Sequence, residues 1–296
     1  MVATLNPRDE VIIPKPFWVS YPDIVKLAGG TPITIETSRN RNFKITADDL
    51  EKNITKNTKW IIINSPSNPT GEVYSSEELK SLVSVLKKYP NIYILSDDIY
   101  EHLLYEKKEK FTTIGEIDDE INSRTLTMNG VSKPYSMTGW RIGYCGGPKK
   151  IIDSMRKLQG QSTSNPSSIS QWAAVEALNG DQSFLKDWLD SFEMRRNKVV
   201  EMINSAKGLS CLKPKGAFYA IAQLPVDDAD KFAQWLLEDF SLDGETVMVA
   251  PASGFYATPN TGSNQVRIAY VLNEESLKSS IRILEEALKV YPGKTI

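Results

Sequence analysis

The 296-residue sequence contains a single histidine, His102, and only two cysteines, Cys145 and Cys211. One histidine excludes a histidine-rich zinc site and leaves no choice of histidine for a serine-based triad. Two cysteines form neither a disulfide framework nor a metal-binding motif. So few cysteines favour a reducing compartment, and we predict a cytoplasmic location. We therefore expect the chemistry to depend on Lys, Arg, Asp and Tyr side chains.

The chain also lacks an apolar run long enough to span a bilayer, and residues 1–10 show no signal-peptide pattern. Its formal net charge of −2 gives no reason to expect nucleic acid or an anionic membrane as a partner. The hydrophobic share of 41% is ordinary for a globular protein, and the length suits one large or two moderate domains. We predict small-molecule substrates.

The apolar pattern of the first two thirds predicts an α/β domain. Thr58–Asn64 and Asn91–Asp97 are continuously apolar, as expected of strands buried on both faces. Ser75–Tyr89 reads as an amphipathic helix whose Ser75 and Glu78 form a capping box. A strand, a helix and a strand in this order indicate a parallel, right-handed crossover. Further strands are predicted at Glu10–Ile13, Thr31–Glu36, Arg124–Met128 and Arg141–Cys145, with a helix ending at Gly29-Gly30. We predict a mostly parallel central sheet with helices on both faces.

After Pro148 the pattern becomes mainly helical, and strands return later. We place a domain boundary inside the second long helix, which gives a large domain at 1–188 and a small α+β domain at 189–296. The predicted helices are Pro166–Leu178, Ser183–Ala206 and Glu274–Val290, and the predicted strands are Ala217–Gln223, Val247–Ala250 and Gln265–Tyr270.

Polar side chains follow three of the predicted parallel strands. Asn68 lies in the loop after the first, Asp97 and Tyr100 lie at the end of the second, and Lys133 follows the third. Ligands of open parallel sheets bind beyond the carboxyl ends of the strands, so an amide, a carboxylate, a phenol and an amine should meet there. Each residue has a simpler reading: Asn68 suits a turn, Asp97 a cap, and Lys133 a solvated loop. Their combination is more informative than any one of them.

Five segments resemble the conserved motifs of class I aminotransferases, enzymes of fold type I that use pyridoxal phosphate (PLP). They occur in the family's order along nearly the whole chain, and their wording is most similar to bacterial-type aspartate aminotransferases. The segment Ser96–Tyr100 differs from the usual form at its third position, where Asp98 stands in place of the family's common Glu. The segments are Asn64–Gly71, Ser96–Tyr100, Gly130–Gly143, Pro214–Tyr219 and Val266–Tyr270.

The resemblance implies a role for each polar residue around PLP. Lys133 would hold the cofactor as a Schiff base and then move the proton at the substrate α-carbon. Asp97 would face the pyridine nitrogen and keep it protonated. Asn68 and Tyr100 would hydrogen-bond the phenolate oxygen of the ring, and Asn68 would also contribute to substrate binding.

The resemblance also assigns residues to the phosphate, the ring face and the substrate. Arg141 would bind the cofactor phosphate, helped by the Ser132 hydroxyl, and Arg267 would pair with the substrate α-carboxylate. Trp18 would stack on the ring and contact the substrate; its alternative is a core aromatic beside a helix start. Without the resemblance, Arg141 and Arg267 would read as surface charges on strands.

The implied activity is amino transfer between an amino acid, with aspartate expected, and a 2-oxo acid such as 2-oxoglutarate. Three alternatives remain open: an aromatic aminotransferase, a PLP-dependent lyase of the same fold, and a non-catalytic fragment. The resemblance also implies a homodimer. Members of the family carry about a hundred further N-terminal residues, including a glycine-containing loop that binds the phosphate at a helix N-terminus. We therefore expect this chain to bind PLP weakly and to have low or no transaminase activity.

Overall fold

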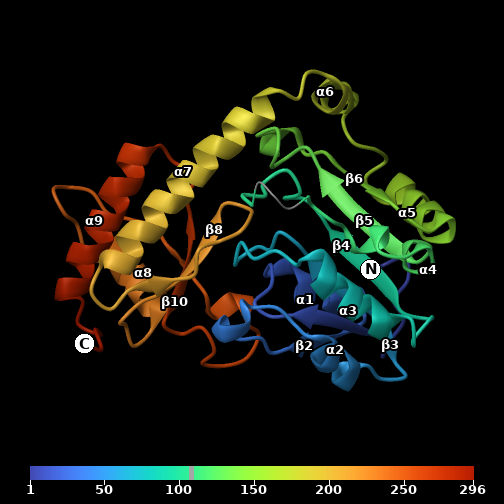
Figure 1. Ribbon diagram of the computed structural model, residues 1–296, viewed down its shortest axis with the longest axis horizontal. Helices are drawn as coiled ribbons and strands as arrows, with labels where there is room; N and C mark the ends of the chain where they lie inside the picture. Colours follow the sequence, from blue (N-terminus) through green and yellow to red (C-terminus); the bar gives the residue numbers. More distant parts are fainter. Residues whose placement is uncertain (107–109) are drawn as a thin grey trace.

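The computed structural model describes residues 1–106 and 110–296 and contains two β-sheets, which lie in different halves of the molecule (Figure 1). The larger sheet has six strands in the order β2-β1-β3-β4-β5-β6. Its strands are β1 (Glu10–Pro14), β2 (Thr31–Ile35), β3 (Thr58–Asn64), β4 (Tyr93–Asp97), β5 (Thr125–Gly130) and β6 (Gly143–Gly146).

Five strands of the larger sheet run parallel, and only β6 pairs antiparallel with its neighbour β5. The carboxyl ends of β1, β3, β4 and β5 therefore lie along one edge, and β6 begins at that same edge. This arrangement confirms the predicted mostly parallel sheet. It also places the loops after four strands next to one another.

Helices cover both faces of this sheet, as predicted. Along β3, Trp60 and Ile62 belong to one core, and Ile61 and Ile63 belong to another, because successive side chains of a strand point to opposite faces. The first core includes residues of α1 (Ser20–Leu27) and α5 (Lys149–Ser162). The second includes residues of α2 (Ala47–Asn53), α3 (Ser76–Leu86) and α4 (Asp119–Asn122). The predicted capping box of Ser75 and Glu78 is present at the start of α3.

The smaller sheet is antiparallel throughout and has the order β7-β8-β10-β9. Long helix α7 runs from the larger half to the smaller half and packs beside α9 (Figure 1). The predicted boundary at residue 188 falls near the start of α7 and stays a prediction. The elements are α6 (Ser168–Asn179), α7 (Phe184–Ser205), β7 (Ser210–Cys211), β8 (Tyr219–Gln223), α8 (Ala229–Glu238), β9 (Ala250–Pro251), β10 (Gln265–Ala269) and α9 (Glu274–Val290). Short 3₁₀ helices are η1 (Arg39–Arg41), η2 (Ile114–Glu116), η3 (Thr138–Trp140) and η4 (Ser253–Phe255).

Two strand predictions need correction. The strand predicted at Val247–Ala250 is wrong over most of its length, because only Ala250 and Pro251 pair with β10. Val247 and Val249 pack on the small-domain core while Met248 is 80% exposed, so the apolar residues alternate without a neighbouring strand. The strand predicted at Arg141–Cys145 begins at Gly143 instead, since Arg141 has a left-handed backbone (φ 56°).

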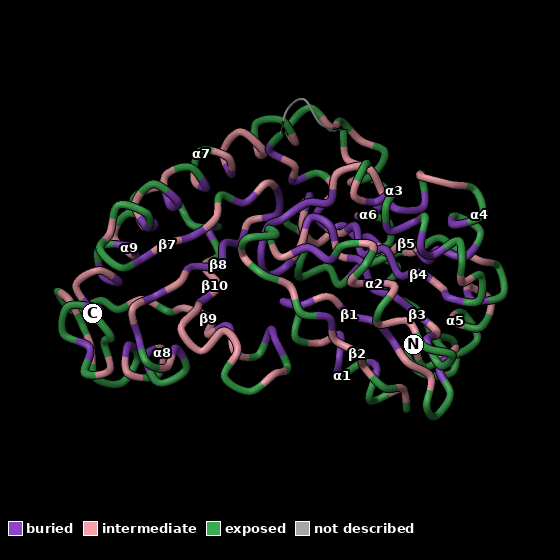
Figure 2. Tube along the Cα trace, turned by 60° about the horizontal axis from the view of Figure 1, so that its bottom comes forward, coloured by how far each residue is buried: buried purple, intermediate pink, exposed green. Residues whose placement is uncertain are grey.

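The two halves are joined by buried backbone contacts, visible as buried chain where they meet (Figure 2). The N–H groups of Lys215 and Gly216 both donate to the carbonyl of Gly71, at 2.9 and 2.8 Å. Gly71 has a φ of +69°, and a Cβ there would lie 2.5 Å from Cβ of Pro214. Only glycine fits this close approach. A second connection is the ammonium of buried Lys15, which bonds both Glu36 and Thr258.

Candidate active site

The ends of β3 and β4 are tied together by one side chain. Asn64 Nδ2 donates to the carbonyl of Asp97 at 2.9 Å, and Asn64 Oδ1 accepts the N–H of Asn68 at 2.8 Å. Both Asn68 and Asp97 are buried. The structure thus brings together two of the loops that the sequence placed at this edge.

Lys133 lies in the loop after β5 and is half-buried. Its Nζ is 5.8 Å from the ring centre of Phe218, and it has no hydrogen-bond or ion-pair partner within residues 1–106 and 110–296. Burial lowers the pKa of the Lys133 ammonium, and the positive charges of Arg267 and Arg141 lower it further. A larger fraction of this amine is therefore neutral and nucleophilic.

Lys133 also lines a pocket of about 430 Å³ that lies between its loop and helix α7. Ser132 and the aromatic residues Trp188, Phe192 and Phe218 also line this pocket. A pocket that combines aromatic rings, hydroxyl groups and a nucleophilic amine can hold an organic ligand with polar groups.

Asp97 is 5% exposed at the end of β4. Its Oδ2 accepts the Tyr21 hydroxyl, and its Oδ1 accepts the N–H of Ile99 at 3.3 Å. Burial raises the pKa of Asp97, and these two hydrogen bonds oppose that rise. Tyr100 is also buried, and its hydroxyl lies 3.1 Å from that of Tyr219 in β8. Burial is the main reason that the pKa of Tyr100 is raised, so its phenol stays protonated.

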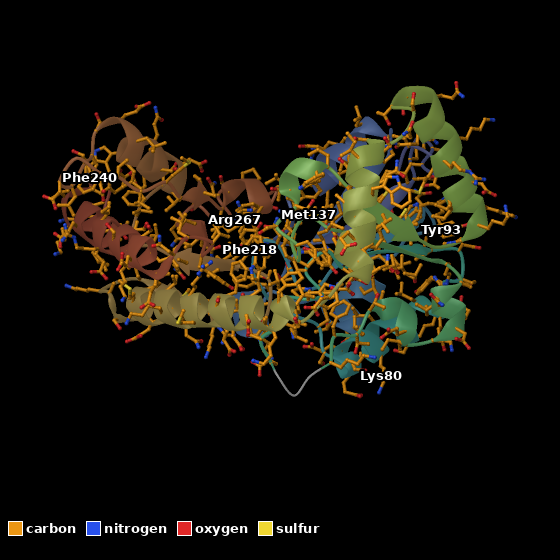
Figure 3. All side chains as sticks on the ribbon, turned by 90° about the horizontal axis from the view of Figure 1, so that it is seen from above. Lys80, Tyr93, Met137, Phe218, Phe240 and Arg267 are labelled. Atoms are coloured by element: carbon orange, nitrogen blue, oxygen red, sulfur yellow. The ribbon has the colours of Figure 1, made fainter. Side chains whose placement is uncertain are left out.

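Arg267 of β10 reaches across from the smaller sheet. Its guanidinium donates to Asn68 Oδ1 at 3.0 Å and lies 4.6 Å from the Tyr219 ring centre and 5.3 Å from that of Phe255. Its Nε is buried and has no hydrogen-bond partner among the described residues. Figure 3 shows Arg267 and Phe218 close together, on the side facing the larger domain. A planar, partly unsatisfied guanidinium suits a carboxylate ligand.

The two remaining predicted residues lie at the rim of the site. Arg141 is exposed and donates to the carbonyl of Thr138 at 2.7 Å, yet it is near enough to lower the pKa of Lys133. Trp18 follows β1, is 37% exposed and packs edge-on against Tyr21. Both side chains are accessible to a ligand. The roles assigned to them, binding the phosphate and covering the ring, stay predictions.

The sequence did not single out three side chains that contact the predicted ones. The Tyr21 hydroxyl donates to Asp97, and the Tyr219 hydroxyl lies beside that of Tyr100. The Phe255 ring lies against the guanidinium of Arg267. Tyr219 belongs to one of the recognised motifs. For Tyr21, the only feature in the sequence that could have indicated a role in the site is its position three residues after Trp18. Within the described chain, no cluster of three metal-ligating side chains is present, and no helix is both long and apolar enough to cross a membrane.

Glu72 is a buried carboxyl behind the Asn68 loop. It is 4% exposed and lines a cavity of about 30 Å³ together with Asn68. Its Oε2 lacks a hydrogen-bond partner within the described residues. Burial raises the pKa of Glu72 to about 7; the charges of Lys44 and Lys215 oppose the rise, and that of Glu78 adds to it. The ionised form is therefore unfavourable in the folded protein.

Replacing Glu72 by glutamine should stabilise the protein above pH 7. The folded-state pKa of about 7 exceeds the ordinary value of 4.5, so stability is lost as pH rises between these values. At pH 8 we expect Glu72→Gln to raise the free energy of unfolding by about 3 kcal/mol, from a shift of about 2.5 pKa units at about 1.4 kcal/mol per unit. Urea titrations at pH 5 and pH 8 measure this, with exposed Glu116→Gln as the control. An unchanged pH dependence in Glu72→Gln would contradict it.

Comparison with known proteins gives the family. Residues 1–284 match the model of the family described as "Aminotransferase class I and II". The chain belongs to this family. It has the fold-type I architecture and is an aminotransferase, as the five motifs predicted.

Among similar aminotransferases, the "probable aspartate/prephenate aminotransferase" of Rhizobium leguminosarum bv. phaseoli is 48% identical over 296 residues, covering 96% of this chain and 71% of that protein. The "aspartate/prephenate aminotransferase" of Cereibacter sphaeroides is 47% identical, covering 95% of this chain and 70% of its own length. Among solved structures, the aspartate aminotransferase of Rhizobium meliloti has a TM-score of 0.88 at 42% identity, over 97% of this chain and 72% of that chain. These comparisons favour neither the lyase nor the non-catalytic alternative.

Proposed function

We propose that this aminotransferase uses PLP to transfer the amino group of aspartate to a 2-oxo acid, with 2-oxoglutarate and prephenate as candidate acceptors. Aminotransferases of this fold type depend on PLP. Relatives at 47–48% identity carry aspartate and prephenate in their names, and prephenate bears a 2-oxo acid side chain. The observation that carries the proposal is the half-buried Lys133 amine, which lines a pocket, has no hydrogen-bond or ion-pair partner among the described residues, and has its pKa lowered by burial and by the charges of Arg267 and Arg141.

The residues of this site fit PLP. An aldehyde requires a neutral amine, and burial lowers the pKa of Lys133. A pyridine nitrogen requires an acceptor, and Asp97 is a buried carboxyl at the adjoining strand end. A phosphate requires exposed cationic donors, and Arg141 is exposed beside Lys133. Asn68 and Tyr100 supply polar groups for the ring oxygen. Trp18 would cover the ring face.

The chain's own residues would then bind the substrate and move a proton. Arg267 would hold the α-carboxylate through its guanidinium fork, and Asn68 would keep that fork oriented. Lys133 Nζ would carry the proton to and from the substrate α-carbon, for which a lowered amine pKa is suitable. When bound, PLP supplies the electron-withdrawing ring that makes this α-proton acidic.

A PLP titration followed by visible absorbance measures cofactor affinity and tests the prediction that binding is weak. With PLP in excess, aspartate and phenylalanine are then compared as donors to 2-oxoglutarate and to prephenate. We expect oxaloacetate from aspartate at a higher rate than phenylpyruvate from phenylalanine, with no ammonia. Ammonia release would indicate a lyase. A PLP-loaded protein without any amino transfer would contradict the proposed function.

We also propose that the protein is a cytoplasmic homodimer. Dimerisation is supported by α6, which exposes four large apolar side chains and so leaves an apolar face to be covered. Light scattering of the purified protein would give twice the chain mass of 33.2 kDa. The exposed residues are Ile169, Trp172, Val175 and Leu178.

A further inference from the structure

Tyr21 contacts the candidate site from α1, outside the residues assigned so far. It is 4% exposed, and its hydroxyl donates to Oδ2 of Asp97, which lies 76 positions further along the chain. Trp18 packs against the same tyrosine, with ring centres 5.4 Å apart and planes at 89°. The short segment from residue 18 to residue 21 therefore supplies both the tyrosine that bonds Asp97 and the tryptophan predicted to cover the ring.

The hydroxyl of Tyr21 is the main side-chain support for a charge on Asp97. Within the described residues Asp97 forms no salt bridge, and its only other hydrogen bond to the carboxylate comes from the Ile99 N–H at 3.3 Å. Burial raises the pKa of Asp97, whereas the bond from Tyr21 lowers it. Burial also raises the pKa of Tyr21, so the phenol stays protonated and keeps donating.

We propose that Tyr21 is a positioning residue that keeps the Asp97 carboxylate ionised and aimed at the ring nitrogen of bound PLP. This inference rests on the proposed function. A carboxylate with one oxygen fixed by a buried hydroxyl cannot rotate freely, so its remaining lone pairs keep one direction. Tyr21 acts through Asp97 and does not itself contact the reacting atoms.

The test is Tyr21→Phe, which removes one oxygen and keeps the ring. We expect PLP to bind about tenfold more weakly or worse, because hydrogen bonds to charged groups are the stronger ones. The value of kcat should fall while KM for aspartate stays unchanged. The matched control is Tyr291→Phe, which removes a tyrosine-to-aspartate bond of 3.1 Å, to Asp227 in the small domain. Tyr291 is 5% exposed, and its variant should bind PLP like wild type.

A cofactor analogue separates this role from a structural one. In 1-deazapyridoxal phosphate a C–H group replaces the ring nitrogen, so Asp97 has no nitrogen to bind. Wild type and Tyr21→Phe should then bind the analogue equally well. An equal loss of affinity for both cofactors, or unchanged PLP affinity with only a lower melting temperature, overturns the inference. If wild type binds neither cofactor, the proposed function itself fails.

A second pair of variants covers the case in which phenylalanine prevents folding. Tyr21→Gln and Tyr21→Met have side chains of similar length, and only glutamine can donate a hydrogen bond. Tyr21→Gln should bind PLP more tightly than Tyr21→Met. Equal affinities in this pair would also overturn the inference.

Discussion

Replacing Lys133 by alanine should abolish the visible absorbance band that appears when PLP is added and should remove nearly all amino transfer. The loss in kcat is expected to reach about 100- to 10,000-fold or more, since this is the usual contribution of a positioned acid–base group. The physical reason is that Lys133 has the only amine in the site with a lowered pKa and an adjoining pocket, among the residues described. Oxaloacetate formation from aspartate, at excess PLP, measures the effect.

The control for this variant is Lys157→Ala, which removes an exposed lysine of α5. Lys157→Ala should keep both the absorbance band and the wild-type rate. If Lys133→Ala also kept the wild-type rate, Lys133 could not be the residue that moves the proton. Retention of the band with loss of turnover would leave proton transfer with Lys133 and place the covalent anchor elsewhere.

Replacing Arg267 by leucine should impair substrate binding more than cofactor binding. The guanidinium bonds Asn68, lies over two aromatic rings and retains an unbonded Nε for a carboxylate. Removing one partner of a buried charge pair costs about 2–5 kcal/mol, or about 30- to 4,000-fold in kcat/KM for aspartate. Steady-state kinetics with varied aspartate give this ratio, and PLP titration gives the cofactor affinity.

Two further variants sharpen the Arg267 experiment. Arg267→Lys keeps the positive charge and loses the planar fork, so it should lie between wild type and Arg267→Leu. Arg282→Leu, on the exposed side of α9, should behave like wild type. If Arg267→Leu lost PLP binding and kept its KM for aspartate, the arginine would belong to the cofactor rather than to the substrate.

Much of the scaffold was predictable because burial imposes visible patterns on the sequence. The predicted strand Thr58–Asn64 and the predicted helix Glu274–Val290 have the observed bounds of β3 and α9. Each of these elements contributes buried side chains to a core at regular intervals from near its first residue to near its last. The predicted strand at Val247 failed because apolar alternation reports which side chains face a core and gives no information on a neighbouring strand.

In the candidate site, too, some residues were predictable from the sequence and others were not. Asn68, Asp97 and Lys133 were predictable because they follow strands whose ends share one edge. Contacts between residues far apart in the sequence were not predictable. Tyr21 meets Asp97 over 76 positions and Tyr100 meets Tyr219 over 119, and no local pattern encodes such a pairing. The unsatisfied carboxyl of Glu72 was also invisible, because its burial follows from how the Asn68 loop packs.

The contacts of Arg267 have a consequence for the entropy of substrate recognition. A free arginine side chain has about 2 kcal/mol of rotamer entropy to lose on binding. Here the guanidinium already lies against two aromatic rings and is bonded to Asn68, so most of that ordering occurs when the protein folds. A carboxylate meets a preorganised fork, and a larger share of the interaction energy remains as affinity. Residues of both halves of the molecule thus order the guanidinium that would bind the substrate before any substrate arrives.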